Sequence, residues 1–494
     1  MKAQSWVAAA GLSVDNAALA RCEIKGLAYD SRQVQPGFCF VAIPGRRHDG
    51  QAFVAEAVKR GAALIIGEED GVTSRVPYLA VPDARLALAH LAAAFYQNPS
   101  ADLTVLGVTG TNGKTTTTFM LQAMARALDK RTGLIGTVRY EIGDRVIPAG
   151  RTTPEAPDIQ RLLREIKRAG ADHAVLEVSS HALDQQRVKG VAFDVAIFTN
   201  LTRDHLDYHG DMEAYFTAKR RFFTDYGDSG KPTAAVINVD DPYGQRLIEE
   251  WRQTDDHASG WTYGLAPAAD VRAADISCTA TGSQCVVTTP WGEVPLRLNQ
   301  MGRYNVYNAL AALTAGGALG WPLAPMAHAL EQMPPVPGRL EPVAAGQPFQ
   351  VFVDYAHTDD ALHNVCTMLA EITPGRLWLV FGCGGDRDHG KRTPMGAVAA
   401  RLAHHTFITA DNPRSEAPQA IADEIIAGFE AATNYTVELD RTRAIHAAID
   451  AAAPGDTVLI AGKGHEKYQE FAHTVVPFDD VDVARAALTP SDAS

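Results

Sequence analysis

The sequence lacks any run of about 20 consecutive apolar residues, which is the length that a membrane-spanning helix requires. The stretch MKAQSWVAAAGLSVDNAALA is apolar in part, but Ser, Asp and Asn interrupt it, so we expect no signal peptide. The six cysteines form neither a CxxC pair nor a dense framework. This cysteine usage indicates reduced thiols in a cytoplasmic protein.

Basic residues are scarce relative to acidic ones. Lys and Arg number 45 against 58 Asp and Glu, which gives a net charge of -13. This balance argues against a nucleic acid or a membrane surface as the main partner, although it allows a local basic pocket for a phosphorylated substrate. A chain of 494 residues is longer than a domain with a single hydrophobic core. We therefore expect about three domains in a monomeric protein.

Two breaks divide the chain into three predicted α/β domains, at residues 1–98, 99–335 and 336–494. The breaks are Asn98-Pro99-Ser100 and a proline-rich segment at 333–338. Buried strands alternate with helical patterns, which predicts mostly parallel sheets. Strands are predicted at 103–108, 174–178, 195–198, 349–353, 377–381, 406–409 and 458–461, with a less regular β-rich stretch at 257–298.

A helical pattern over 84–96 closes the first domain, and Asp83 before it is a candidate N-cap.

In the second domain, the segment GTNGKTT at 110–116, which we call the phosphate loop, lies between a predicted strand and a predicted helix. Backbone N–H groups in such a turn can surround phosphate oxygens, and the helix dipole adds to their effect. Lys114 adds a positive charge, and the Thr115 hydroxyl is a candidate Mg²⁺ ligand.

The glycine spacing of the phosphate loop differs from the strict Walker A pattern, so a simple glycine-rich turn is the alternative. The Gly-Lys-Thr-Thr ending favours nucleotide binding.

Glu177 ends a predicted strand at the sheet edge where ligands bind, which indicates a second Mg²⁺ ligand and leaves a solvated strand end as the alternative. His205, in the segment DHLDYH, also fits a polar loop, and no zinc-type spacing accompanies it. Lys219 alone is typical of an exposed helical lysine.

The segment TGTNGKTTT resembles the nucleotide loop of the Mur ligases, which are ATP-dependent enzymes that add amino acids to the peptidoglycan precursor. Folylpolyglutamate synthetases share a related loop, so the loop alone indicates a superfamily. Further segments of all three domains also resemble the family. The resemblance implies an N-terminal UDP-binding α/β domain, a central P-loop-type domain with a mostly parallel sheet, and a C-terminal Rossmann-like α/β domain.

The resemblance also implies the chemistry of an ATP-dependent acid–amino-acid ligase. A carboxylate attacks the γ-phosphate of ATP, and an amine then displaces phosphate from the acyl phosphate. The implied ATP-binding residues are Gly110, Thr111, Asn112, Gly113, Lys114, Thr115, Thr116, Asn305, Arg339 and Asp354. The implied Mg²⁺ ligands are Thr115, Glu177, His205 and Lys219, the last as a carbamate (N6-carboxylysine). Lys114, Glu177, His205 and Lys219 are the implied catalytic residues.

Other segments resemble the contacts that the family makes with a UDP-linked peptide substrate. The implied residues are Tyr29, Ser31, Arg46, Arg47, His48, Arg151, Thr152, Thr153, Ser179, Gln185 and Arg187. Two adjacent arginines suit a diphosphate in an otherwise acidic protein. Arg151 departs from the family, which often has Asn at this position.

Three loops of the third domain each follow a predicted strand: the segment around Arg387, the turn 411–414 and the segment 462–466. If these strands are parallel, the loops project from one sheet edge, where they can bind a zwitterionic amino acid. Arg387 and Arg414 would bind its carboxylates. Asp411 and Glu466 would bind its ammonium groups.

For these loops the resemblance implies meso-diaminopimelate as the amino acid and a UDP-N-acetylmuramoyl-dipeptide as the acceptor. The implied amino-acid contacts are Arg387, Asp411, Asn412, Pro413, Arg414, Gly462 and Glu466. Three alternatives stay open: a lysine-adding ligase, a folylpolyglutamate synthetase-like ligase, and a regulatory protein that uses ATP as a switch.

Overall fold

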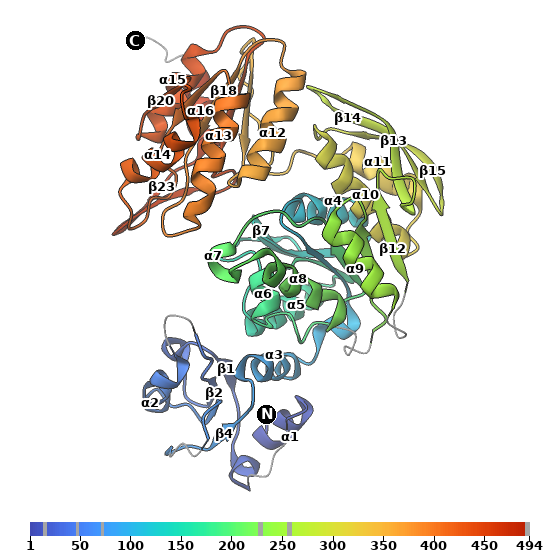
Figure 1. Cartoon of the computed structure of the whole chain (residues 1–494). Coiled ribbons are helices and arrows are strands. Elements are labelled where there is room, and N and C mark those ends of the chain that lie inside the picture. Colours follow the sequence, from blue (N-terminus) through green and yellow to red (C-terminus); the bar gives the residue numbers. More distant parts are fainter. Residues whose placement is uncertain (13–16, 46–48, 71–73, 226–230, 254–258, 490–494) are drawn as a thin grey trace.

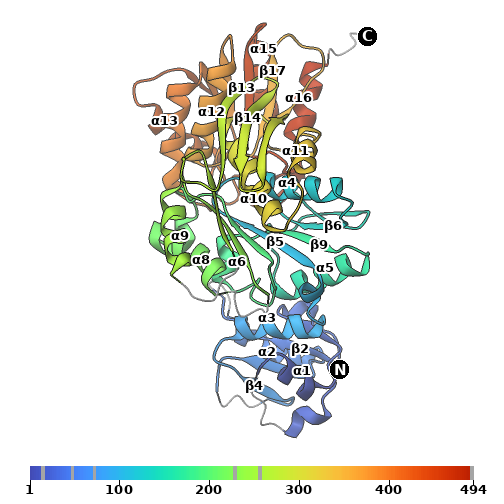
Figure 2. The same ribbon diagram turned by 90° about the vertical axis from the view of Figure 1, so that its right-hand side faces the viewer.

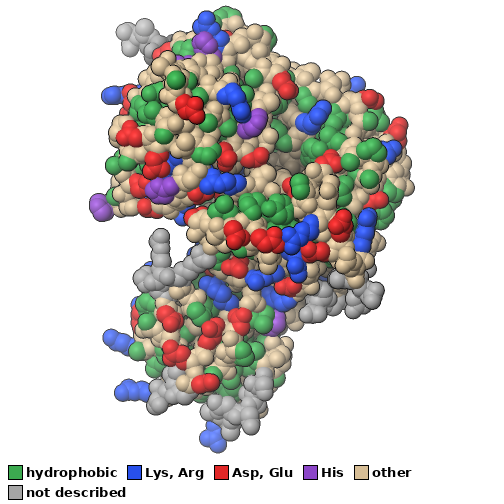
Figure 3. All heavy atoms as spheres, in the orientation of Figure 1, with side chains coloured by type: hydrophobic (Ala, Val, Ile, Leu, Met, Phe, Trp, Pro, Cys, Tyr) green, Lys and Arg blue, Asp and Glu red, His purple; other side chains and the backbone are tan. Residues whose placement is uncertain are grey.

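The computed structural model describes residues 1–12, 17–45, 49–70, 74–225, 231–253 and 259–489. Three sheets follow one another along the chain, and Figures 1 and 2 show the three domains arranged in a row from the N-terminal to the C-terminal one. Among the described residues, no helix combines the length and apolar character needed to cross a membrane. Acidic and basic side chains are intermingled over the face seen in Figure 3.

The N-terminal domain has a four-stranded parallel sheet in the order β1-β2-β3-β4. Its strands are β1 (Gly26–Ala28), β2 (Phe38–Val41), β3 (Leu64–Gly67) and β4 (Tyr78–Ala80), and its helices are α1 (Ala3–Ala9), α2 (Val54–Lys59) and α3 (Ala84–Phe95). Helix α3 begins after Asp83, whose side chain accepts the Leu86 N–H at 2.8 Å, so the predicted cap is confirmed.

The central domain contains an eleven-stranded sheet in the order β15-β14-β13-β12-β11-β10-β5-β9-β6-β7-β8. Its parallel middle is formed by β5 (Thr104–Thr109), β6 (Thr132–Ile135), β9 (His173–Glu177), β10 (Val195–Phe198), β11 (Ala234–Asn238) and β12 (Gly260–Gly264). The prediction of a mostly parallel sheet is therefore confirmed. On one side the margin consists of the antiparallel strands β7 (Arg139–Ile142) and β8 (Arg145–Pro148). On the other side β13 (Val271–Thr279) is parallel to β12, and the antiparallel strands β14 (Gly282–Thr289) and β15 (Gly292–Leu298) follow it.

Helices cover both faces of this central sheet. One core contains α4 (Lys114–Ala127), α10 (Arg303–Ala318) and α11 (Leu323–Glu331), and the other contains α5 (Ala156–Arg168), α8 (Met212–Thr224) and α9 (Pro242–Arg252). Two short helices, α6 (Ser180–Asp184) and α7 (Leu206–His209), follow strand ends. In the register of the sheet, Val108 pairs with Glu177 and Thr109 with Phe198, so the loops after β5, β9 and β10 start at the same edge.

The C-terminal domain has a six-stranded sheet in the order β16-β17-β21-β18-β19-β20, parallel except for β16. The strands are β16 (Glu341–Pro342), β17 (Gln350–Asp354), β18 (Leu377–Phe381), β19 (His405–Ile408), β20 (Tyr435–Val437) and β21 (Thr457–Ala461). Helices α12 (Asp359–Ile372), α13 (Arg392–Leu402) and α14 (Pro418–Ile426) cover one face, and α15 (Arg441–Ala451) and α16 (Asp480–Leu488) cover the other. A separate hairpin, β22 (Tyr468–Phe471) and β23 (Thr474–Pro477), follows β21.

Candidate active site

The phosphate loop connects β5 to α4, as the sequence predicts. Gly113 has φ of 85°, and a Cβ there would lie 2.3 Å from Oδ1 of Asn308, so both the backbone conformation and the space require glycine. Lys114 is the first residue of α4, and its Nζ donates hydrogen bonds to the Gly110 and Thr111 carbonyl oxygens at 2.9 and 2.7 Å. Burial lowers the pKa of this ammonium.

Glu177 is buried beside the phosphate loop. One carboxylate oxygen accepts the Thr137 N–H at 2.7 Å, and the other accepts the hydroxyls of Thr137 and Thr115 at 2.8 and 3.0 Å. The structure therefore brings together two of the sequence-predicted Mg²⁺ ligands, Thr115 and Glu177. The carboxylate is held by hydrogen bonds and is not a solvated strand end.

His205 and Lys219 line the same cavity as the phosphate loop. His205 precedes α7, and its ring lies 4.9 Å from that of His181. Burial lowers the pKa of His205 to about 3, so the imidazole is neutral at pH 7. Lys219 is not an exposed helical lysine: it is 1% exposed, and its Nζ donates to the Gly110 carbonyl at 2.7 Å. Burial, with Lys114 nearby, holds the pKa of Lys219 well below its usual value.

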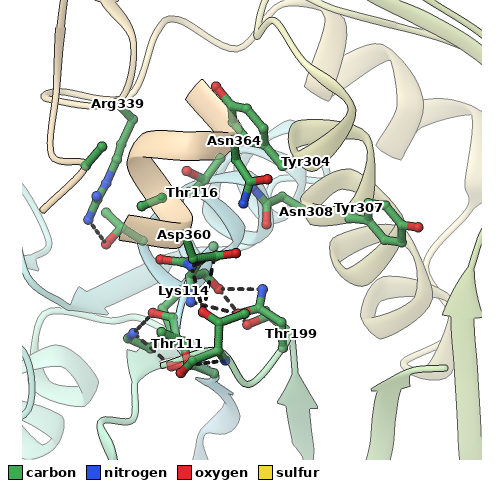
Figure 4. A pocket seen from close by; sticks show the side chains of 18 of the residues that line it. Thr111, Lys114, Thr116, Thr199, Tyr304, Tyr307, Asn308, Arg339, Asp360 and Asn364 are labelled. Carbon is green, nitrogen blue, oxygen red and sulfur yellow. Dashed lines mark hydrogen bonds between the residues drawn. The ribbon is translucent and has the colours of Figure 1, made fainter. Parts of the chain in front are cut away.

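The C-terminal domain contributes to the same site. Arg339 Nη2 donates to the Thr115 hydroxyl at 3.0 Å, and its guanidinium lies 4.6 Å from the Tyr355 ring centre. The Asp354 carboxylate accepts the N–H groups of Leu340 and Ala356 at 2.7 and 2.8 Å, and burial raises its pKa. A cavity of about 860 Å³ lies between the two domains and is lined by all ten implied ATP contacts (Figure 4).

Asp360 is a site residue that the sequence analysis missed. One of its carboxylate oxygens accepts hydrogen bonds from Asn112 Nδ2 at 2.8 Å and from the Thr202 hydroxyl at 3.1 Å. Figure 4 shows this carboxylate above Lys114, at the end of α12 that faces the phosphate loop. Asn305, one of the implied ATP contacts that line the cavity, donates to the Met301 carbonyl and accepts a bond from Asn308.

Several residues implied for the UDP-linked substrate gather next to Glu177. The Thr153 hydroxyl donates to the Glu177 carbonyl and accepts the Ser179 N–H, while Arg187 donates to the Thr153 carbonyl at 2.9 Å. The Thr152 hydroxyl accepts a hydrogen bond from Thr137. This group therefore lies beside the candidate Mg²⁺ ligand.

The remaining residues implied for the UDP-linked substrate lie further from Glu177 or in the N-terminal domain. Gln185 accepts a hydrogen bond from Arg187, and Arg151 pairs with Glu155 at 2.7 Å. Tyr29 donates to Asp158 on α5 at 3.0 Å, and Ser31 donates to Glu56 within the N-terminal domain at 3.1 Å. These two do not line the cavity described above. Arg46, Arg47 and His48 lie outside the described residues.

The three C-terminal loops meet at one sheet edge, as predicted. They follow β18, β19 and β21, which are adjacent and parallel. Arg414 Nη1 donates to the Gly385 carbonyl at 2.8 Å, and Glu466 accepts Asn412 Nδ2 at 2.8 Å. Asp411, Asn412 and Pro413 are buried, whereas Arg387 is exposed.

Two further residues of this loop cluster were missed in the sequence. Lys463 is fully buried, and its ammonium donates to Asn412 at 3.0 Å and lies 3.4 Å from both Asp411 and Glu466. Burial and the charge of Asp411 raise the pKa of Glu466. Glu470 on β22 pairs with Arg414 at 2.8 Å. The loop cluster thus contains both charge signs, as binding of a zwitterion requires.

Comparison with known proteins covers the whole chain. Residues 23–96 match the profile described as Mur ligase family, catalytic domain; 108–316 match the Mur ligase middle domain; and 338–464 match the Mur ligase, glutamate ligase domain. UDP-N-acetylmuramoyl-L-alanyl-D-glutamate–2,6-diaminopimelate ligase of Geobacter metallireducens is 46% identical over 94% of both chains. The protein of the same name from Gloeobacter violaceus is 45% identical over 99% of this chain and 98% of its own.

Solved structures agree with this result. A UDP-N-acetylmuramoyl-L-alanyl-D-glutamate–2,6-diaminopimelate ligase superposes with a TM-score of 0.71 at 33% identity, covering 99% of this chain and 98% of its own. A folylpolyglutamate synthase of Mycobacterium tuberculosis shares the fold at a TM-score of 0.65 and 18% identity, covering 81% and 94%. With near-full-length relatives well above 40% identity, the chain belongs to the Mur ligase family.

Proposed function

We propose that the protein is an ATP-dependent ligase that joins meso-2,6-diaminopimelate to the D-glutamate of UDP-N-acetylmuramoyl-L-alanyl-D-glutamate, releasing ADP and phosphate. The observation that carries the proposal is the near-full-length similarity, at 46% identity, to a protein of that name. The amino-acid pocket at the C-terminal sheet edge and the cavity at the phosphate loop support it.

In the first step, the D-glutamate γ-carboxylate attacks the γ-phosphorus of ATP, and the bond to the β–γ bridging oxygen breaks to release ADP. Lys114 and the N–H groups at the start of α4 stabilise the negative charge on the phosphates. Arg339 reaches the phosphate loop from the other domain, so closure of the two domains completes this site and excludes water.

The residues around Glu177 fit a magnesium ion. Mg²⁺ takes one or two carboxylates and completes its shell with water and phosphate oxygens, and the Thr115 hydroxyl and Glu177 carboxylate lie 3.0 Å apart. Within the described part of the chain, no three His, Cys, Asp or Glu side chains gather as a metal cluster, which does not favour zinc. When bound, Mg²⁺ neutralises charge that develops on the transferred phosphoryl group.

His205 and Lys219 would hold a second ion, with Lys219 as a carbamate. A neutral lysine amine adds to CO₂ and loses a proton, and this converts a potential cation into an anion. The buried position of Lys219 and its lowered pKa favour the neutral amine from which a carbamate forms.

In the second step, the amine of the bound amino acid attacks the acyl phosphate, and the carbon–oxygen bond to phosphate breaks. Asp411 and Glu466 would hold an ammonium group of diaminopimelate, and Arg387 and Arg414 its carboxylates. Asn412, Pro413 and Gly462 shape the loops that carry these groups. The UDP-linked dipeptide would extend from Thr152, Thr153 and Arg187 toward the N-terminal domain.

The proposal also includes the domain boundaries 1–98, 99–335 and 336–494, a monomeric state and a cytoplasmic location.

The proposed activity is tested by a coupled assay of ADP release by the purified protein with ATP, Mg²⁺ and the UDP-linked dipeptide. We expect release only when diaminopimelate is added. Greater turnover with lysine would assign the lysine-adding reaction, and turnover with a folate substrate would assign the folylpolyglutamate one.

A further inference from the structure

Arg414 has an unusual backbone conformation for a residue with a large side chain. Its φ is 51°, in the left-handed region that L-residues occupy at a cost in free energy. Its N–H donates to the Glu470 carbonyl at 3.1 Å, and Arg414 forms an isolated bridge with Phe471. The left-handed backbone of Arg414 therefore occurs together with backbone contacts to strand β22.

The Arg414 side chain is also fixed at two points. Nε donates to Oε2 of Glu470 at 2.8 Å, and Nη1 donates to the Gly385 carbonyl at 2.8 Å. A guanidinium has five N–H donors, so these bonds use two of them. Three donors therefore remain, one on Nη1 and two on Nη2, and donors of this kind can engage a carboxylate.

Glu470 is itself held by the turn that carries Arg414. The Glu470 N–H donates to Asn412 Oδ1 at 3.0 Å, and the neighbouring Gln469 donates through Nε2 to the Asp411 carbonyl at 3.1 Å. Strand β22 is thus joined to residues 411–414 by both backbone and side chains. Glu470 consequently stands next to the guanidinium before any ligand arrives.

We propose that Glu470 is a positioning residue that selects diaminopimelate through Arg414, by orienting the guanidinium so that its Nη1–Nη2 edge meets the distal carboxylate. The inference rests on the proposed function and assigns a role to a residue that the proposed function does not use. A free arginine side chain loses much rotational freedom on binding, and orienting it beforehand removes that cost.

Glu470 also has an opposing effect, because its negative charge weakens the attraction of the guanidinium for a carboxylate. The two effects predict opposite results when Glu470 is removed. Loss of orientation raises the KM for diaminopimelate, whereas loss of competing charge lowers it. The pair is only partly exposed, at 19% for Arg414 and 39% for Glu470, and both ends are anchored, so orientation dominates in the proposal.

The test compares Glu470→Ala and Glu470→Gln with the unaltered protein in the ADP-release assay. We expect Glu470→Ala to raise the KM for diaminopimelate about tenfold, with kcat and the KM for ATP changed less than about twofold. Glu470→Gln keeps an oxygen that can accept from Nε, so a smaller rise is expected. The KM for the UDP-linked dipeptide, which the proposed function places away from Arg414, should not change.

Asp482→Asn is the matched control, because it removes the same charge from an ion pair with Arg485 on α16. Thermal unfolding of each variant identifies a folding defect, and the isosteric Glu470→Gln decides the result if Glu470→Ala is unstable. An unchanged or lower KM for diaminopimelate, or an equal rise in the KM for the UDP-linked dipeptide, overturns the role of Glu470. Absence of diaminopimelate-dependent ADP release by the unaltered protein overturns the proposed function instead.

Discussion

Arg414 is the residue on which the choice between diaminopimelate and lysine depends in the proposed function. Arg414→Ala removes the partner of the distal carboxylate, and a charge-assisted, two-point grip contributes about 2–3 kcal/mol. We therefore expect kcat/KM for diaminopimelate to fall roughly 30- to 150-fold, with little change in the KM for ATP. Steady-state ADP release measures both constants. Equal losses for diaminopimelate and ATP would count against a role in amino-acid choice.

Single residues were predictable from the sequence where their neighbours in space are also neighbours along the chain. Lys114 and Thr115 lie within one turn of the glycines that define the phosphate loop, so a short motif identifies them. Glu470 lies 56 residues after its partner Arg414, and Asp360 lies 248 residues after Asn112. No local pattern distinguishes such acids from surface charges, because only the fold brings the partners together.

At the scale of the element, continuous apolar runs in the sequence predicted the positions of buried strands accurately. The predicted ranges 195–198 and 377–381 coincide with β10 and β18, where a continuous apolar run follows a charged residue, Asp194 or Arg376. The hairpin β22–β23 was not predicted. Val475 and Val476 on β23 are exposed, and the buried residue of β22 is the polar Gln469, so no buried apolar run marks the hairpin. Its position depends on bonds to the turn 411–414.

Helices α15 and α16 are joined by a fully buried ion pair, and this predicts a large effect on stability. Arg441 donates to the two carboxylate oxygens of Asp480 at 2.7 and 2.8 Å, and also to the Ala461 carbonyl at the end of β21. Asp480→Ala leaves a buried guanidinium without its counter-charge, so we expect a loss of about 3–5 kcal/mol.

Urea unfolding measures this loss of free energy from the transition of the C-terminal domain. Asp482→Ala is the control, since its side chain is 71% exposed in an ion pair with Arg485 and should change stability by less than about 1 kcal/mol. If Asp480→Ala proved as stable as this control, the buried pair would not be what joins the two helices.

At the scale of the whole molecule, polar contacts connect the central and C-terminal domains around the cavity. Asp360 accepts from Asn112 and Thr202, and Arg203 donates to the Gly390 carbonyl at 3.0 Å. Figure 4 shows the Asp360 side chain between the two domains. The sequence predicted the three domains but not these contacts, because they depend on how the domains are placed relative to each other.

Burial raises the pKa of Asp360, and the charge of Asp359 adds to this effect, although the bond from Thr202 opposes it. In an open arrangement the same carboxyl would be solvated, with its ordinary pKa. The closed form therefore binds the proton more tightly. The contribution of Asp360 to closure is complete below its ordinary pKa and is lost as the pH rises through the raised value.

Asp360→Asn imitates the protonated carboxyl, since its amide oxygen can still accept the bonds from Asn112 and Thr202. We expect the variant to be more closed than the unaltered protein at about pH 7, and its closure to depend less on pH. Small-angle X-ray scattering without nucleotide measures this as a smaller radius of gyration. Asp423→Asn, which removes a charge from an exposed residue of α14, should behave as the unaltered protein. A radius that is equal or larger for Asp360→Asn would show that the ionised carboxylate holds the domains together.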